Sequence, residues 1–241
     1  MLNYYVLLNH VYFVYIFHTG EGTARMLTND DYAKAFHEIK NSITIVNSSL
    51  QLLERYHPEI SAYEYWKDSR DALDYLREMI RELSQANLAT DFPLQPTSLA
   101  LLLNNVLATI RSLRTTDEFH CQCNIPEGLP LIMADSCRLT QAIMNLVKNA
   151  FEAMHGIGTI ILNVYQEDTH IRLDIIDFGG GVSEELKKHL FTPFFTSKQN
   201  GTGLGLSITK QIVESHRGTL TFVSRNGDGC TFSIVLPALT K

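Results

Sequence analysis

IRLDIIDFGGG, residues 171–181, is an apolar stretch that runs directly into three glycines. Its apolar and β-branched residues, bounded by glycines, predict a buried strand that ends in a tight loop. Asp177, at the end of that strand, can accept a hydrogen bond from an exocyclic amine, and the glycines after it allow a flat base to approach the backbone closely. The alternative interpretation is that Asp177 is a turn residue ahead of a glycine loop.

A second glycine-rich stretch, GTGLGLS at residues 201–207, opens a predicted helix that continues through Val213 and ends near Gly218. Glycines at a helix N-terminus leave N–H groups and the positive end of the helix dipole available to phosphates. The stretch has no Gly-Lys-Ser sequence and no preceding strand, so it matches neither a P-loop nor a dinucleotide fingerprint. Each glycine run by itself is a weak signal.

The predicted helix over residues 135–154, DSCRLTQAIMNLVKNAFEAM, carries Asn145 and Asn149 four residues apart on one face. A neutral amide oxygen can ligate Mg²⁺, a hard cation that prefers oxygen and keeps waters and phosphate oxygens around it. Buried asparagines that bond only to the backbone are the alternative. Another amphipathic helix is expected over 98–113, strands over 160–165 and 171–176, and two strands joined by a turn at 226–229. This mixture predicts an α+β sandwich over residues 97–241.

The segment before it has a helical repeat. Apolar residues spaced alternately by three and four predict a helix over about 31–56, at Phe36, Ile39, Ile43, Val46, Leu50 and Leu53. His57-Pro58 interrupts it, and a second seam runs from Trp66 to Asn87. Residues 31–90 are therefore expected to form an antiparallel helical hairpin. Its apolar stripes are too narrow to stabilise a lone hairpin, so dimerisation into a four-helix bundle is expected, with 91–96 as linker.

On the first of these helices, His37 follows the seam residue Phe36, so its side chain is expected to point outward beside the bundle core. Glu38 and Asn41 share this exposed patch. A carboxylate beside an imidazole can hold its tautomer or take its proton while the ring attacks phosphorus. Taken alone, the group is more simply a solvated polar helix face, since a single His-Glu pair is a weak motif.

Composition narrows the class of protein. Apolar residues make up 45% and charged residues 19% of the 241, which is typical of a folded globular chain. The net charge of -6 argues against nonspecific nucleic-acid binding, which requires a cationic surface. The four cysteines have no zinc-finger spacing and are expected to be reduced structural thiols of a cytoplasmic protein.

Residues 1–18 contain no Asp, Glu, Lys or Arg. A β segment fits the VYFVYIF stretch, a membrane anchor is the second interpretation, and a remnant of a lost upstream region is the third. We treat 1–30 as a short apolar N-terminal segment, with membrane association through residues 1–18 as the alternative to a purely cytoplasmic chain.

In chain order the sequence presents the His37 helix, the asparagine helix, DFGGG at 177–181, FTPFFTSK at 191–198 and GTGLGL at 201–206. This order resembles the H, N, G1, F and G2 boxes of two-component histidine kinases over about residues 30–241. The joint pattern is specific, because five weak motifs occur in the expected sequence. The closest style is that of the nitrogen-regulation and sporulation kinases, which have a short ATP lid.

The resemblance implies a HisKA-type dimerisation hairpin followed by a Bergerat-type (GHKL) ATP-binding domain. It implies that His37 is the phosphoacceptor, Glu38 its acidic partner, and Asn41 the residue that positions a water for dephosphorylating the response regulator. Asn149 resembles the Mg²⁺ ligand, and residues 180–202 would form the ATP lid. The remaining residues implied to contact ATP are Asn145, Asp177, Gly179, Gly181, Phe195, Lys198, Gly201, Thr202, Gly203, Leu204 and Gly205, with Phe194 packing the lid beside Phe195.

Two departures from the family pattern concern how the kinase activity would be regulated. Similar kinases usually have proline where this chain has Ser42, so the helix is expected to be straighter there. Only about 30 residues precede the His37 helix, too few for an ordinary sensory domain.

The sequence thus predicts a homodimeric ATP- and Mg²⁺-dependent histidine kinase that transfers its phosphoryl group to a response regulator receiver domain. One alternative is a phosphotransfer or scaffold protein with reduced autokinase activity, although Asn149, Asp177 and the glycines are intact. Another is a different ATPase of the same superfamily, but those lack a histidine-bearing hairpin, and gyrase-like members have Glu where this chain has Asn145.

Overall fold

The structure is a computed structural model that describes residues 29–87, 93–112, 118–198, 201–225 and 227–239. Contacts divide the chain into two units, residues 1–87 and 88–241, and each is described by itself. The expectations for residues 1–18 lie outside the described residues. Within the described part, no helix is both long and apolar enough to cross a bilayer.

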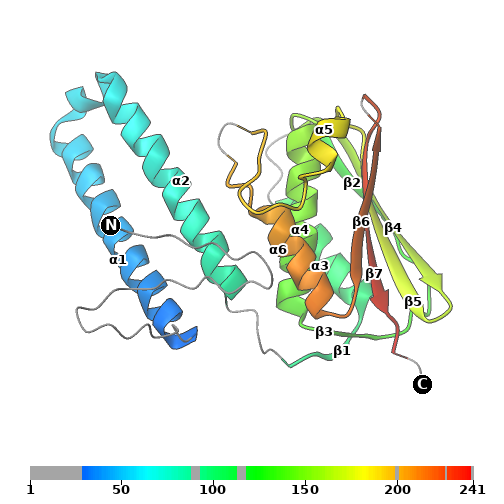
Figure 1. Ribbon diagram of the computed structural model, residues 1–241. Helices are drawn as coiled ribbons and strands as arrows, with labels where there is room; N and C mark the ends of the chain where they lie inside the picture. Colours follow the sequence, from blue (N-terminus) through cyan, green and yellow to red (C-terminus); the bar gives the residue numbers. More distant parts are fainter. Residues whose placement is uncertain (1–28, 88–92, 113–117, 199–200, 226, 240–241) are drawn as a thin grey trace. The chain divides into compact units, whose positions relative to one another are not determined.

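Unit 1 consists of two long helices with a short connection, as Figure 1 shows: α1 (Asn29–Tyr56), the 3₁₀ turn η1 (Pro58–Ala62) and α2 (Glu64–Asn87). Pro58 occupies the first turn of η1, where a missing N–H costs nothing. The helices contact each other, and Arg70 donates a hydrogen bond from Nη1 to Asn47 Oδ1 over 3.0 Å. α1 continues without interruption through Ser42, whose hydroxyl donates to the carbonyl oxygen of Glu38 over 2.9 Å.

The seam positions of α1 are only partly covered. Ile39, Val46 and Leu53 are each more than 40% exposed, whereas Leu73 of α2 is buried. An apolar side chain left in water forgoes most of the roughly 1.5–3 kcal/mol that full burial of a Val, Leu or Ile side chain contributes. The described part of unit 1 therefore carries an apolar stripe without a covering element.

Unit 2 packs helices against a five-stranded sheet of order β2-β4-β5-β7-β6. β2 and β4 are parallel and the other neighbours antiparallel, and a separate pair is formed by β1 and β3. Figure 1 shows α3, α4 and α6 together on one face of the sheet. The elements are β1 (Gln95–Thr97), α3 (Leu99–Ser112), β2 (Phe119–Asn124), β3 (Ile132–Ala134), α4 (Ser136–Ala153), β4 (Gly158–Glu167), β5 (His170–Asp177), α5 (Glu184–Lys187), α6 (Gly205–Ser215), β6 (Thr219–Arg225) and β7 (Gly229–Pro237).

The core of unit 2 lies between these helices and the sheet. Alternate residues of β4 and β5 are buried, among them Ile160, Leu162, Leu173 and Ile175, because side chains of a strand point alternately to its two faces. α4 adds its own buried stripe, which includes Leu139, Ile143 and Leu146. The predicted α+β architecture is confirmed for this unit.

Two boundaries differ from the sequence prediction. Gln95 and Pro96 were expected in a linker over 91–96, but they belong to β1, which pairs with β3 alone. A two-stranded ribbon is all edge, and an edge strand tolerates the missing N–H of proline. The helix expected to open at GTGLGLS begins at Gly205, so residues 201–204 form a loop ahead of it.

Candidate functional site

The predicted site residues fall into two sets, one in each unit. In unit 2, α4 begins with Asp135 as its N-cap, whose Oδ1 accepts hydrogen bonds from the backbone N–H groups of Cys137 and Arg138 over 2.9 and 3.1 Å. Such a cap stabilises the helix by about 0.5–2 kcal/mol. The helix then carries Asn145 and Asn149, both half-buried.

Asn145 lies at the contact between α4 and α6. Its Nδ2 donates to Thr209 Oγ1 over 2.8 Å, and Thr209 in turn donates to the carbonyl oxygen of Gly205 over 2.9 Å. A Cβ added to Gly205 would lie 2.6 Å from Asn145 Oδ1. The structure therefore brings Asn145 to the start of α6, and a side chain at 205 would have to displace its amide.

Asn149, one turn further along, meets Lys198. Asn149 Oδ1 accepts a hydrogen bond from Lys198 Nζ over 3.0 Å, and the same ammonium forms an ion pair with Glu152. Lys148 also approaches Glu152, with Nζ 4.0 Å from Oε1. Glu152 was missed by the sequence prediction, although its place three residues after Asn149 on the same helix face was the available signal.

The oxygens of Asn149 and Glu152 form a donor set that suits a hard cation. An amide oxygen and a carboxylate oxygen are ligands that Mg²⁺ accepts together with water and phosphate oxygens. A cation, the ammonium of Lys198, already contacts both side chains. The local chemistry therefore fits Mg²⁺, with Asn149 as the predicted ligand.

Asp177 closes β5 and is only 5% exposed. Its Oδ1 accepts a hydrogen bond from the backbone N–H of Gly179 over 3.0 Å. Burial raises the pKa of the carboxyl, and the backbone N–H groups of Gly179 and Cys230 offset part of this rise. The neighbouring Cys230 thiol has its pKa raised to about 12, first by burial and then by the charge of Asp177. A buried acceptor thus stands at the end of an apolar strand.

The loop after Asp177 requires glycine at specific positions. A Cβ on Gly179 would lie 2.7 Å from the carbonyl oxygen of Ala153 at the end of α4, and Gly181 has a φ of 68°. Gly229 of β7 was predicted only as part of a turn, but a Cβ there would lie 2.1 Å from the carbonyl oxygen of Asp177. The backbone around Asp177 is therefore closely enclosed by α4 and β7.

The glycine loop before α6 packs against the segment that precedes it. Gly203 has a φ of 68°, and a Cβ there would lie 2.4 Å from the carbonyl carbon of Phe194; a Cβ on Gly201 would lie 2.5 Å from Thr196 Oγ1. Thr202 and Leu204 are buried, and Thr202 Oγ1 accepts from the N–H of Leu204 over 3.3 Å. The FTPFFTSK and GTGLGL stretches thus form one packed unit.

The two phenylalanines of this segment behave differently. The Phe195 ring lies 5.3 Å from that of His189, centroid to centroid. Phe194 is 47% exposed, and its predicted role in packing the lid stays a prediction. Its backbone is in the left-handed region, with φ 65°, and it is this backbone that contacts Gly203.

In unit 1, His37 is exposed on α1, as predicted. Its Nδ1 lies 3.3 Å from Asn41 Nδ2, one helical turn later. The Glu38 side chain is exposed beside it. The E-x-x-N pattern therefore places an amide against one ring nitrogen of the histidine.

Comparisons with known proteins agree with this geometry. Residues 134–240 match the family model of the histidine kinase-, DNA gyrase B-, and HSP90-like ATPases. The chain is 32% identical over 206 residues to the sensor histidine kinase ZraS of Escherichia coli K12, covering 83% of this chain and 43% of that one. It is 31% identical over 209 residues to sporulation kinase B of Bacillus subtilis, covering 86% and 49%. The chain thus spans less than half the length of these curated relatives.

Solved structures of histidine kinases are also similar to this chain. The catalytic domain of the histidine kinase ThkA is 31% identical, with a TM-score of 0.55 over 61% of this chain and 97% of that domain. Full-length ShkA in complex with AMPPNP has a TM-score of 0.72 over 89% of this chain and 47% of that one; at 24% identity it supports the fold alone. The resemblance drawn from the sequence is confirmed: the chain belongs to the two-component sensor histidine kinase family, with an ATPase domain of the histidine kinase, gyrase B and HSP90 type.

Proposed function

We propose that the protein is an ATP-dependent histidine kinase that phosphorylates His37 and passes the phosphoryl group to an aspartate of a response regulator receiver domain. The observation that supports this proposal most directly is that the exposed His37, with Asn41 Nδ2 3.3 Å from its Nδ1, is in the same chain as an ATPase domain. In that arrangement the amide holds one ring nitrogen and leaves Nε2 toward solvent. A relative of known structure, ThkA, has been crystallised with the response regulator TrrA.

In this proposal, unit 2 binds ATP through three groups. The buried carboxylate of Asp177 accepts from the adenine amino group, and Gly179 and Gly181 let the base approach the backbone. The phosphates meet Gly201, Gly203, Gly205 and the N-terminus of α6, an 11-residue helix whose dipole favours anions. Thr202, Leu204 and Asn145 shape this loop through the contacts described above, and Phe195 anchors the lid segment.

Asn149 would hold Mg²⁺, with Glu152 beside it. When bound, the metal ion neutralises charge on the phosphate oxygens. Lys198 is the cation on the protein side, and its contact with Asn149 supports a position close to the terminal phosphate. Asn149 and Lys198 would then orient the γ-phosphoryl group for attack.

The phosphoryl transfer is direct. The two ends of the Asn41 amide are exchangeable, so its Oδ1 can accept from Nδ1–H of His37 and fix the tautomer that keeps the Nε2 lone pair free. Nε2 forms a bond to the γ-phosphorus, and the bond from that phosphorus to the β–γ bridging oxygen breaks, so ADP leaves with the electron pair. Glu38 balances the positive charge that develops on the ring. A receiver carboxylate oxygen later replaces Nε2 on phosphorus.

We further propose that the protein works as a homodimer. The exposed seam of Ile39, Val46 and Leu53 supports a second hairpin as the covering element. Asn41 would also position a water for dephosphorylating the regulator, so the same residue would take part in phosphorylation of His37 and in dephosphorylation of the regulator. Ser42 follows it within an uninterrupted helix.

Labelling with γ-³²P-ATP tests the proposal. His37→Gln removes the nucleophile, so acid-labile labelling should fall to background while ADP binding to unit 2 is unchanged. His57→Gln, which alters another exposed histidine of unit 1, is the matched control and should label as the wild type does. Labelling of His37→Gln at the wild-type rate would show that the phosphoacceptor lies elsewhere.

A further inference from the structure

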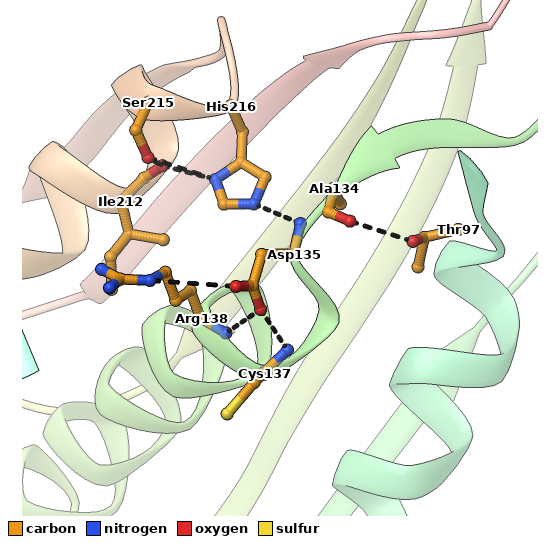
Figure 2. A network of polar contacts seen from close by, with 8 residues as sticks. All are labelled: Thr97, Ala134, Asp135, Cys137, Arg138, Ile212, Ser215 and His216. Atoms are coloured by element: carbon orange, nitrogen blue, oxygen red, sulfur yellow. Dashed lines mark hydrogen bonds and ion pairs between the residues drawn. The ribbon is translucent and has the colours of Figure 1, made fainter. Parts of the chain in front are cut away.

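His216 is a buried histidine that the proposed chemistry does not use. It is the C-cap residue of α6 and is 2% exposed. Its Nδ1 lies 2.7 Å from the carbonyl oxygen of Ile212, and its Nε2 lies 2.9 Å from the backbone nitrogen of Asp135 (Figure 2). Because the carbonyl can only accept and the backbone N–H can only donate, the proton must be on Nδ1 and the ring must be neutral.

The partner of Nε2 is the residue that starts α4. Asp135 caps that helix with its carboxylate, and its Oδ2 lies 3.9 Å from Arg138 Nε. Just before it, the carbonyl oxygen of Ala134 accepts a hydrogen bond from Thr97 Oγ1 of β1 over 3.2 Å. Figure 2 shows the beginning of α4 held from two sides, by β1 and by the end of α6.

The ring therefore joins two helices that both carry candidate ATP contacts. α4 holds Asn149 about 20 Å further along, at 1.5 Å per residue, while α6 begins at the glycine loop. A second polar link between them, from Asn145 to Thr209, lies close to the site. The His216 contact joins the end of α6 to the start of α4, and the Asn145 contact lies about 15 Å further along α4, so together they resist both sliding and tilting of one helix against the other.

We propose that His216 is a positioning residue for the nucleotide site, which sets the placement of Asn149 relative to the phosphate-binding loop by fixing the end of α6 to the start of α4. The inference rests on the proposed ATP and Mg²⁺ sites. It assigns the ring a role at a distance, since His216 touches no proposed ligand. Asp177 ends β5 and lies in neither of the two helices that this link joins.

Because Asp177 would contact the base and Asn149 the phosphates, the effect of Mg²⁺ on ADP binding gives a readout that a loss of stability alone would not move. The ratio of the ADP dissociation constant in EDTA to that in Mg²⁺ measures how well the Asn149 side of the site meets the phosphates. Calorimetric titration of His216→Phe, which leaves the Asp135 N–H without its acceptor, should show this ratio reduced at least fivefold. The dissociation constant in EDTA should stay within twofold of the wild type.

Two further variants separate the acceptor from the bulk of the ring. His216→Gln retains an oxygen that can accept from Asp135, so it should restore most of the ratio. Ser215→Ala removes a hydroxyl that donates to the Ile212 carbonyl oxygen over 2.7 Å and lies 3.4 Å from His216 Nδ1, but it leaves the contact between Nε2 and Asp135 in place, so it should match the wild type. A wild-type ratio in His216→Phe, or an equal loss in His216→Gln, would overturn the proposal. Absence of ADP binding by the wild-type protein would instead contradict the proposed function.

Hydrogen exchange on the unmodified protein decides the matter if His216→Phe does not fold. Coupling between two sites is reciprocal, so ADP with Mg²⁺ must strengthen the contact that positions its site. The Asp135 amide should exchange more slowly after ADP and Mg²⁺ are added. The Ala238 amide, which donates to the Thr169 carbonyl over 2.9 Å, is the comparison, and equal slowing of both would refute the role of His216.

Discussion

The ammonium of Lys198 lies 3.0 Å from the amide oxygen of Asn149, and it pairs at the same time with Glu152. A lysine of the lid segment is thus held against the helix face that carries the proposed Mg²⁺ ligand. A metal ion bound by Asn149 would have to share or displace this contact, because two cations repel each other at such a distance. The position of the 191–198 segment and the proposed metal binding are therefore linked through one side chain.

The glycine loop before α6 offers a direct stability test. Gly203→Ala adds a Cβ 2.4 Å from the carbonyl carbon of Phe194, on a residue with φ 68°. Gly128→Ala is the matched control, since Gly128 has φ 73° but nothing within 4 Å. The control should lose about 1–2 kcal/mol from its left-handed backbone alone. Gly203→Ala should lose about 1–3 kcal/mol more from overpacking, as measured by urea unfolding. Equal losses would show that the close approach is absent in solution.

The buried carboxylate of Asp177 should lower the stability of the folded protein and raise its affinity for ADP. Burial raises the pKa of its carboxyl above the unfolded value, so the ionised group opposes folding at pH 7, and this opposition fades as the pH falls toward the unfolded pKa. Asp177→Asn should therefore raise Tm at pH 7, with a difference that narrows toward pH 4. Its ADP affinity should fall about 10–100-fold, the value of a hydrogen bond to a charged group. A Tm difference that does not depend on pH would contradict this account.

The sequence predicted α3, α4, α6 and the strands β4 to β7 because apolar alternation and the two glycine runs are local signals, whereas β1, β3 and α5 had no predicted counterpart. Asp177, Asn149 and His37 could each be singled out from their own neighbours. Local signals could not place Pro96 in β1, since that strand exists only through its pairing with β3. Nor could they show that Gly229 encloses Asp177, because the two residues meet across β5 and β7.

Contacts between charged or polar side chains far apart in the sequence could not be predicted either. Glu152 and Lys198 lie 46 residues apart in the sequence, and nothing in either stretch indicates their ion pair. His216 likewise reads as an ordinary residue at the end of a helix, and its acceptor role follows only from the distance to the Asp135 amide. Long-range contacts of single polar atoms are what the sequence pattern leaves undetermined.

Dimerisation through the exposed seam of α1 can be tested with adjacent residues. Val46→Glu places a charge on the seam, where the side chain is 48% exposed in the single chain, and should shift the protein to monomers in light scattering. Ile45→Glu, at a position 66% exposed and off the seam, is the matched control and should stay dimeric. Burying an unpaired charge is strongly unfavourable, which is why only the seam position is expected to respond. Dimers in both variants would place the interface elsewhere.

The Lys198–Glu152 pair should hold the lid segment in the absence of nucleotide, and a double-mutant cycle measures how strongly. The side chains are 45% and 35% exposed, so the pair should contribute about 0.2–1 kcal/mol, as partly exposed ion pairs do. Glu152→Gln and Lys198→Met should each speed chymotrypsin cleavage after Phe194 or Phe195 up to about fivefold, the rate equivalent of 1 kcal/mol. The double variant should be cleaved no faster than Lys198→Met, which removes both the ion pair with Glu152 and the hydrogen bond to Asn149, since the ion pair is then already lost. Lys148→Met, whose lysine approaches Glu152 from within α4, is the control and should leave cleavage unchanged. Additive effects of the two substitutions would mean that they act separately and that the pair does not hold the segment.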